Sequence, residues 1–120
     1  MAQEHPMTIL FIPTESRAGE TRVAATPETV ARFVRQGLDV LIERGAGTAA
    51  SYMDPAYEKA GATLCGPESW GTAEVVAKVQ PPTLEEAGRL RKGCILVSMV
   101  TPSAQLELVT ALKEGDITCL

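Results

Sequence analysis

Five apolar runs recur along the chain, and each is predicted to form a strand. They span residues 8–12, 38–42, 75–79, 95–100 and 117–120. Most of the runs are rich in β-branched residues and are continuous rather than alternating in polarity, as is typical of strands buried on both faces. The pattern therefore predicts a parallel sheet covered by helices on each side.

Helical segments with recognisable start signals lie between these runs. Thr26 can cap the first helix, Pro27 occupies its first helical position and Glu28 places an acid in its first turn, before Gly37 ends it. The other predicted helices begin at an Asp-Pro pair (54–55), at a capping box (83–86) with its stop at 92–93, and at a second Thr-Pro pair (101–102) with its stop at 115, and a single turn is predicted at 67–70.

This alternation of strands and helices predicts βαβ units. Such units close right-handed and place their ligand-binding loops at the carboxyl ends of the strands. At 120 residues the chain has room for a single hydrophobic core. We therefore expect one domain, a flavodoxin-like three-layer α/β sandwich with a mostly parallel sheet.

Composition narrows the classes of function. Hydrophobic residues make up 45% of the chain and charged residues 22%, which is ordinary for a folded globular protein. The formal net charge is -4 and there is no basic run, so we expect no nucleic-acid partner and no anionic membrane surface. The longest apolar tract, CILVSMV, is too short to cross a bilayer, and the N-terminus has no basic leader. We expect a cytoplasmic protein without direct membrane insertion.

The cysteines and the single histidine limit the chemistry further. Cys65, Cys94 and Cys119 are far apart and lie in apolar segments without a CxxC pair, so we expect reduced, buried thiols and no metal site. His5 lies in the N-terminal tail beside a proline, which argues against a catalytic triad. Trp70 is expected to be a packed aromatic residue.

One glycine-rich segment, GAGTAA from Gly45 onward, follows a predicted strand and superficially matches the GxGxxG/A dinucleotide fingerprint. The helix that should follow at once is interrupted by Asp54 and Pro55, and no acidic residue ends the next strand at a convincing spacing. A Gly-rich turn therefore explains the segment better than a phosphate site.

Two cations, Arg22 and Lys78, are candidates for a binding pocket. Lys78 lies in the apolar run VVAKV near a strand end, where an unpaired ammonium costs on the order of several kcal/mol. Arg22 precedes a helix N-terminus, which itself favours anions, so the two could converge on a carboxylate or phosphate. Alternatively, Arg22 pairs with Glu15 or Glu20 and Lys78 points outward. Glu15 either orients Arg22 or is a solvated loop acid.

Six motifs follow one another along essentially the whole chain: ILFIPTES, ETRVAATPETV, QGLDVLIERGAG, DPAYEKAGA, VVAKVQPP and GCILVSMVTPSAQ. In this order they resemble the N-terminal segment of the family that joins alanine dehydrogenase to the alpha subunit of proton-translocating NAD(P) transhydrogenase. The resemblance covers essentially the whole chain, although each motif taken alone is only modestly specific for the family.

The resemblance implies roles for particular residues. In the alanine dehydrogenase branch, the residues at the positions of Arg22 and Lys78 bind the carboxylate-bearing substrate, and a catalytic histidine occupies the position of Thr101. Without that histidine, amination of pyruvate has no proton donor there, and LVSMVTPSAQ instead resembles the transhydrogenase branch. The resemblance thus implies a transhydrogenase alpha subunit, with Arg22, Lys78, Glu15 and Thr101 as pocket or cleft candidates and no catalytic residue in this chain.

The resemblance also implies that residues 1–120 are the first part of the family's discontinuous non-Rossmann domain. NAD would be bound mainly outside this chain, by a Rossmann domain that is absent here, and other transhydrogenase subunits would be partners. A late helical segment of the full subunit normally packs on this domain, so we expect an incomplete domain that forms homo-oligomers through uncovered apolar surface. The alternatives are an alanine-dehydrogenase-like fragment and a non-catalytic flavodoxin-like binding module.

Residues 1–120 alone are expected neither to bind NADH tightly nor to transfer hydride, because the resemblance places the cofactor-binding domain outside them. Isothermal titration calorimetry of NADH into the isolated chain should show no micromolar binding. A micromolar Kd would contradict this prediction.

Overall fold

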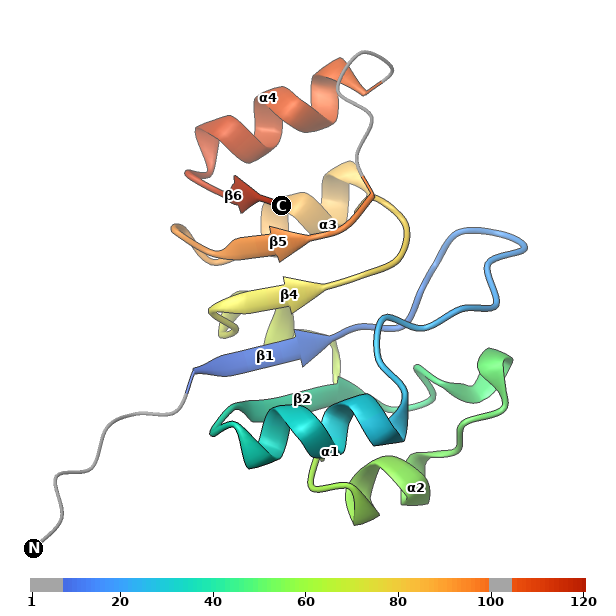
Figure 1. The fold of residues 1–120 in the computed structure, drawn as a ribbon. Coiled ribbons are helices and arrows are strands. Elements are labelled where there is room, and N and C mark those ends of the chain that lie inside the picture. The colour runs from blue at the N-terminus through green and yellow to red at the C-terminus, as the bar shows by residue number, and fades with distance from the viewer. Residues whose placement is uncertain (1–7, 100–104) are drawn as a thin grey trace, which may run out of the picture.

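The computed structural model describes residues 8–99 and 105–120. Six parallel strands form one sheet in the spatial order β3-β2-β1-β4-β5-β6 (Figure 1). The strands are β1 (Ile9–Ile12), β2 (Asp39–Glu43), β3 (Thr63–Cys65), β4 (Val75–Ala77), β5 (Ile95–Val97) and β6 (Thr118–Cys119). The α-helices are α1 (Pro27–Arg35), α2 (Asp54–Lys59), α3 (Leu84–Arg89) and α4 (Leu106–Glu114), and the 3-10 helices are η1 (Thr48–Ala50) and η2 (Pro67–Gly71). The predicted α/β class is confirmed.

The sheet contains the five predicted strands and one that the sequence pattern did not reveal. The additional strand, β3, has three residues and pairs with β2 at one edge of the sheet. A run this short shows no hydrophobic period, and Gly61 and Gly66 lie on either side of it, so the segment reads as a loop. With β3 included, the sheet has the 3-2-1-4-5-6 order of the classic doubly wound α/β fold; the five predicted strands without β3 keep the flavodoxin-like order.

Helices on both faces of the sheet make three layers. On one face, α1 and α2 pack on a core that includes Leu10 and Ile12 of β1. On the other face, η2, α3 and α4 pack on a core that includes Phe11 of β1 and Leu96 of β5. Successive residues of a strand point to opposite faces, so the central strand β1 is buried on both, as predicted.

Three α-helices begin at the predicted signals, α2 among them at Asp54, and a fourth does not. The Thr26 hydroxyl accepts the N–H of Thr29 at the start of α1, and Thr83 and Glu86 form the reciprocal capping box at the start of α3. By contrast, α4 begins at Leu106, so the predicted start at 101–102 is wrong for this helix. Those two positions lie outside the described residues.

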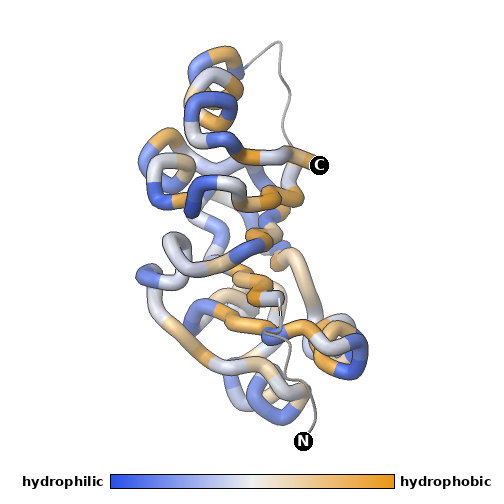
Figure 2. The backbone as a smooth tube through the Cα atoms, turned by 90° about the vertical axis from the view of Figure 1, so that its left-hand side faces the viewer, coloured by the Kyte–Doolittle hydropathy of each residue, from blue (hydrophilic) through white to orange (hydrophobic). Residues whose placement is uncertain are grey.

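The α1 side of β5 has no helix over it among the described residues. Ile95 and Val97 point to this side and are 36% and 41% exposed. Val97 also lines an apolar groove of about 300 Å³ beside Phe33 of α1. In Figure 2, where α1 lies to the right, helices on that side flank only the lower part of the sheet. The prediction of burial on both faces is therefore wrong for β5, because α1 and α2 pack beside β2 and β3 instead.

The residues singled out for burial behave differently from one another. Cys65 and Cys94 are buried free thiols, as predicted, but Cys119 is exposed. Cys119 lies in the two-residue edge strand β6, which has only β5 as a neighbour, so the prediction of burial is wrong for this thiol. Trp70 is packed as predicted, with its ring edge-to-face on Phe11 at a centroid distance of 5.7 Å.

Tyr57 connects α2 to the loop before α1. Its side chain is fully buried, and its hydroxyl donates to the Ala25 carbonyl oxygen at 2.8 Å. A Cβ atom at Gly47 would lie 2.6 Å from the Tyr57 ring, so only glycine fits there. The second glycine of the GAGTAA segment is thus required by packing against Tyr57.

Tyr57→Phe is expected to lower the free energy of unfolding by about 1 kcal/mol at neutral pH, because it leaves the Ala25 carbonyl without its buried donor. Burial raises the pKa of Tyr57 from 10.0 to about 12. The contribution of the neutral phenol is therefore complete below pH 10 and is lost as the pH rises toward 12. Urea denaturation from pH 7 to 11 should show the difference between the two proteins shrinking in the alkaline range. Tyr52→Phe is the control, since the Tyr52 hydroxyl has no hydrogen-bond partner among the described residues; an equal loss there would contradict the prediction.

Candidate functional site

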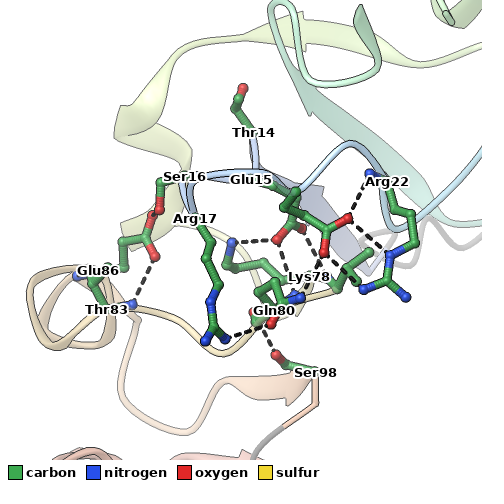
Figure 3. Close-up of polar contacts among 12 residues, drawn as sticks. Thr14, Glu15, Ser16, Arg17, Arg22, Lys78, Gln80, Thr83, Glu86 and Ser98 are labelled. Carbon is green, nitrogen blue, oxygen red and sulfur yellow. Dashed lines mark hydrogen bonds and ion pairs between the residues drawn. The ribbon is translucent and has the colours of Figure 1, made fainter. Parts of the chain in front are cut away.

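The carboxyl ends of β1 and β4 meet where the connections of the sheet diverge. From β1 the chain proceeds to β2 and β3 on one side, and then crosses to β4, β5 and β6 on the other. In open parallel sheets such a topological switch point leaves a crevice in which ligands bind. The loop after β1 carries Glu15 and Arg22, and the loop after β4 begins with Lys78 (Figure 3).

Lys78 is buried and paired. Its Nζ lies 3.0 Å from Glu15 Oε1, and only 1% of the Lys78 side chain and 3% of the Glu15 side chain are exposed. Glu15 also accepts the backbone N–H groups of Val79 and Gln80, at 2.8 and 3.1 Å. An ammonium has three N–H donors, and Glu15 is the acceptor of one of them among the described residues. The pair therefore joins the two loops and leaves donors on Nζ for a further oxygen.

Arg22 forms a separate ion pair with Glu20. Its Nε and Nη2 donate to the two Glu20 oxygens at 2.9 and 2.8 Å, and its backbone N–H donates to Glu20 Oε2 at 2.7 Å. The Glu20 side chain is 5% exposed, whereas that of Arg22 is 59% exposed. The Arg22 guanidinium, and secondly the Gln80 amide, hold the pKa of Glu20 far below its usual range. The pKa of Arg22 is raised by the same pairing. Both groups therefore stay charged at any physiological pH.

Gln80 connects the two ion pairs. Its backbone N–H donates to Glu15, and its side-chain Nε2 donates to Glu20 Oε1 at 2.7 Å. Its side-chain oxygen accepts from Arg17 Nη1 at 2.9 Å, and its carbonyl accepts from the Ser98 hydroxyl at 2.9 Å. In Figure 3, Gln80 lies between the Arg17 and Arg22 side chains. One residue of the loop after β4 thus holds the loop after β1 at Glu15, Arg17 and Glu20.

The structure brings most of the predicted site residues together, in pairs that differ from those expected. Glu15 is buried against Lys78. It therefore neither orients Arg22 directly nor is a solvated loop acid, and both roles predicted for it are corrected. Lys78 does not point outward, whereas Arg22 has Glu20 as partner, as the alternative held. Thr101 lies outside the described residues.

Sequence reasoning missed the role of Gln80, which it considered as part of the VVAKVQPP motif. The available signal was its position, because a polar side chain two residues after Lys78 also lies at the carboxyl end of a central strand.

Similarity to known proteins shows to which family the chain belongs. Residues 11–120 match the family described as "Alanine dehydrogenase/PNT, N-terminal domain". The chain belongs to this family.

Members of both branches of the alanine dehydrogenase/PNT family resemble the chain to a similar degree. It is 38% identical to alanine dehydrogenase of Bacillus subtilis (strain 168), covering 93% of this chain and 30% of that protein. It is 36% identical to NAD(P) transhydrogenase subunit alpha of Haemophilus influenzae, covering 93% and 22%. The crystal structure of transhydrogenase from Sinorhizobium meliloti matches with a TM-score of 0.89 at 34% identity, covering 92% and 33%. The chain thus spans about a third or less of these relatives' length.

The name of the Haemophilus influenzae relative, NAD(P) transhydrogenase subunit alpha, points to a nicotinamide cofactor for that protein, but the GAGTAA segment of this chain does not fit a dinucleotide. The Gly45 N–H donates to Asp54 Oδ1 at 2.9 Å instead of remaining free for a phosphate. The short helix η1 follows, rather than the long helix of the fingerprint, and Gly47 accommodates Tyr57. These residues form a packed turn, so no step of a reaction is assigned to them.

Residues 8–99 and 105–120 contain neither a cluster of potential metal ligands nor a helix that could span a membrane. Among them, no three His, Cys, Asp or Glu side chains come together as a potential metal site. None of the helices there has the length and apolar character needed to span a membrane.

Glu15→Ala is expected to lower the free energy of unfolding by about 3–5 kcal/mol, because Lys78 would remain buried without its counter-ion. The double variant Glu15→Leu, Lys78→Met should recover part of this loss, since it removes both charges. Glu28→Ala, which breaks the exposed pair with Arg32, is the matched control and should change stability by less than about 1 kcal/mol. Urea denaturation measures all three. A Glu15→Ala loss as small as that of the control would contradict the prediction.

Proposed function

We propose that this chain forms one wall of the reaction cleft of an NAD(P)-dependent oxidoreductase, at the crevice between β1 and β4. The observation that carries the proposal is the buried Lys78–Glu15 pair at the topological switch point, in a chain of the alanine dehydrogenase/PNT family. A charge kept in such a place at the cost of desolvation is a candidate for contact with a bound molecule. The cofactor supplies the hydride, and protein groups set position and charge around it.

Within the family we place the transhydrogenase branch first. The chain would then be the N-terminal segment of the alpha subunit of a proton-translocating NAD(P) transhydrogenase, which transfers hydride between NADH and NADP together with other subunits. Thr101 supports this assignment, because it stands where the resemblance expects the catalytic histidine of alanine dehydrogenase. A threonine hydroxyl does not titrate near neutral pH and is a poor replacement for a histidine proton donor.

Alanine dehydrogenase is the second candidate, and the geometry of the cations favours it. Arg22 presents an exposed guanidinium, and Lys78 has N–H groups beyond the one bound to Glu15. An arginine fork with a nearby ammonium suits a small acid that carries a carboxylate and a carbonyl oxygen. This candidate requires a proton donor other than residue 101.

We also propose that residues 1–120 are the first part of a discontinuous domain. The exposed Ile95 and Val97 and the adjoining apolar groove support this, because a monomer seldom leaves a contiguous apolar face uncovered. Another polypeptide segment would cover the α1 side of β4 and β5, and the Rossmann domain would lie outside this chain.

Two assays of the full natural protein decide between the branches. In the first assay we expect NADH-dependent reduction of an NADP analogue. In the second we expect no alanine-dependent reduction of NAD, because residue 101 is not a proton donor. Alanine-dependent reduction that survives removal of NADP would instead establish the second candidate. Inactivity in both assays, with NADH bound, would contradict the proposed oxidoreductase cleft.

A further inference from the structure

We propose that Glu20 and Gln80 are positioning residues that hold the Arg22 guanidinium side-on, so that its outer edge forms a preorganised receptor for a single carboxylate. This inference rests on the proposal that the crevice between β1 and β4 belongs to the reaction cleft. It assigns a role to two side chains that are not among the candidate substrate contacts.

The first step is the use of the Arg22 donors. A guanidinium carries five N–H groups. The Nε–H and one Nη2–H bind the two oxygens of Glu20. The other three, on Nη1 and Nη2, have no acceptor among the described residues, and the side chain is 59% exposed. These three groups include the end-on fork, whose parallel N–H bonds match the two oxygens of a carboxylate.

The second step is the rigidity of Glu20. Its carboxylate accepts four hydrogen bonds, from the backbone N–H, Nε and Nη2 of Arg22 and from Gln80 Nε2. Its side chain is 5% exposed, so water does not compete for these oxygens. An arginine side chain free in solution loses considerable rotamer entropy when it binds. Here that loss is incurred on folding, and the outer fork is already oriented.

The third step is the link to the second cation. Glu20 lies in the loop after β1, and without Gln80 it would be fixed only to its own loop neighbour Arg22. The Gln80 side chain binds Glu20 while its backbone N–H binds Glu15, the partner of Lys78. Gln80 therefore sets where Arg22 stands relative to Lys78. Two cations in a fixed relation favour one small acid over larger or uncharged molecules.

Gln80→Leu tests the inference without changing any charge, because it removes the side-chain hydrogen bonds and keeps the backbone ones. In the full natural protein with NADH bound, the Kd for pyruvate should rise about tenfold, while that for uncharged pyruvamide stays within about twofold. Gln36→Leu, at the exposed end of α1, is the matched control and should change neither value. Arg22→Lys should reduce the preference for pyruvate over pyruvamide, because an ammonium keeps the charge but lacks the paired N–H groups of the fork.

A charge-conserving exchange distinguishes positioning from a merely structural effect. Gln80→Glu places a second carboxylate against Glu20 and should weaken pyruvate binding more than Gln80→Leu does. Adding Glu20→Gln restores a donor–acceptor pair between residues 20 and 80 at the wild-type net charge and should recover stability. The amide nitrogen of residue 20 cannot accept from Arg22, however, so the Nε and Nη2 pairing is not restored and pyruvate affinity should stay low. In ¹⁵N-arginine-labelled protein, the Arg22 Nε–H should exchange slowly with water in wild type, and faster in Gln80→Leu and in the exchanged pair.

Unchanged pyruvate affinity in folded Gln80→Leu, or wild-type pyruvate affinity in a folded exchanged pair that lacks the second acceptor for Arg22, overturns the inference. So does a wild-type protein that shows no Arg22-dependent preference for pyruvate. These readouts are binding and proton exchange, so they are separate from the hydride-transfer assays. If the wild-type protein binds pyruvate as expected but does not catalyse transhydrogenation, the result contradicts the proposed transhydrogenase branch. The positioning role of Glu20 and Gln80 is then unaffected.

Discussion

The buried ion pair between Lys78 and Glu15 is the constraint on which the candidate site depends. The Lys78 side chain follows a central strand and is removed from water, so its ammonium must have an anion as partner. Glu15 meets that need from the neighbouring strand end and accepts two backbone N–H groups of the loop after β4. The ends of β1 and β4 at the switch point are thus joined by an interaction whose single truncation is costly, so their relative position is set in the folded protein before anything binds.

Charge is distributed so that each cation keeps part of its binding capacity. Glu15 neutralises Lys78 and Glu20 neutralises Arg22, yet both pairings leave N–H donors unused among the described residues. The difference in exposure matters, since Lys78 lies inside and Arg22 presents its outer edge to solvent. Gln80, which is uncharged, couples the two pairs without altering this balance. A neutral connector suits this place, because a charged one would compete with either carboxylate or either cation.

The uneven covering of the sheet has a different cause. The helices α1 and α2, which follow β1 and β2, pack on one face of the sheet, and η2, α3 and α4 pack on the opposite face. Beyond β4, the α1 side therefore has no helix of its own among the described residues, and Ile95 and Val97 are left exposed. This follows from topology and not from the residues themselves, whose apolar character is that of a buried strand.

The sequence alone determined the class of fold and the elements that build it. Continuous apolar runs marked five of the six strands, and the cap residues Thr26 and Thr83 marked two helix starts, because these signals depend on neighbours within a few residues. It also singled out Arg22, Lys78 and Glu15 and the family resemblance. Only the tertiary structure decided which carboxylate each cation binds, that Gln80 joins the pairs, and that the face over β5 is bare. The Lys78–Glu15 and Gln80–Glu20 contacts join residues some 60 positions apart, and their distances are fixed by strand order, about which local patterns carry no information. Arg22 and Glu20 are near neighbours, and local patterns left open whether they pair.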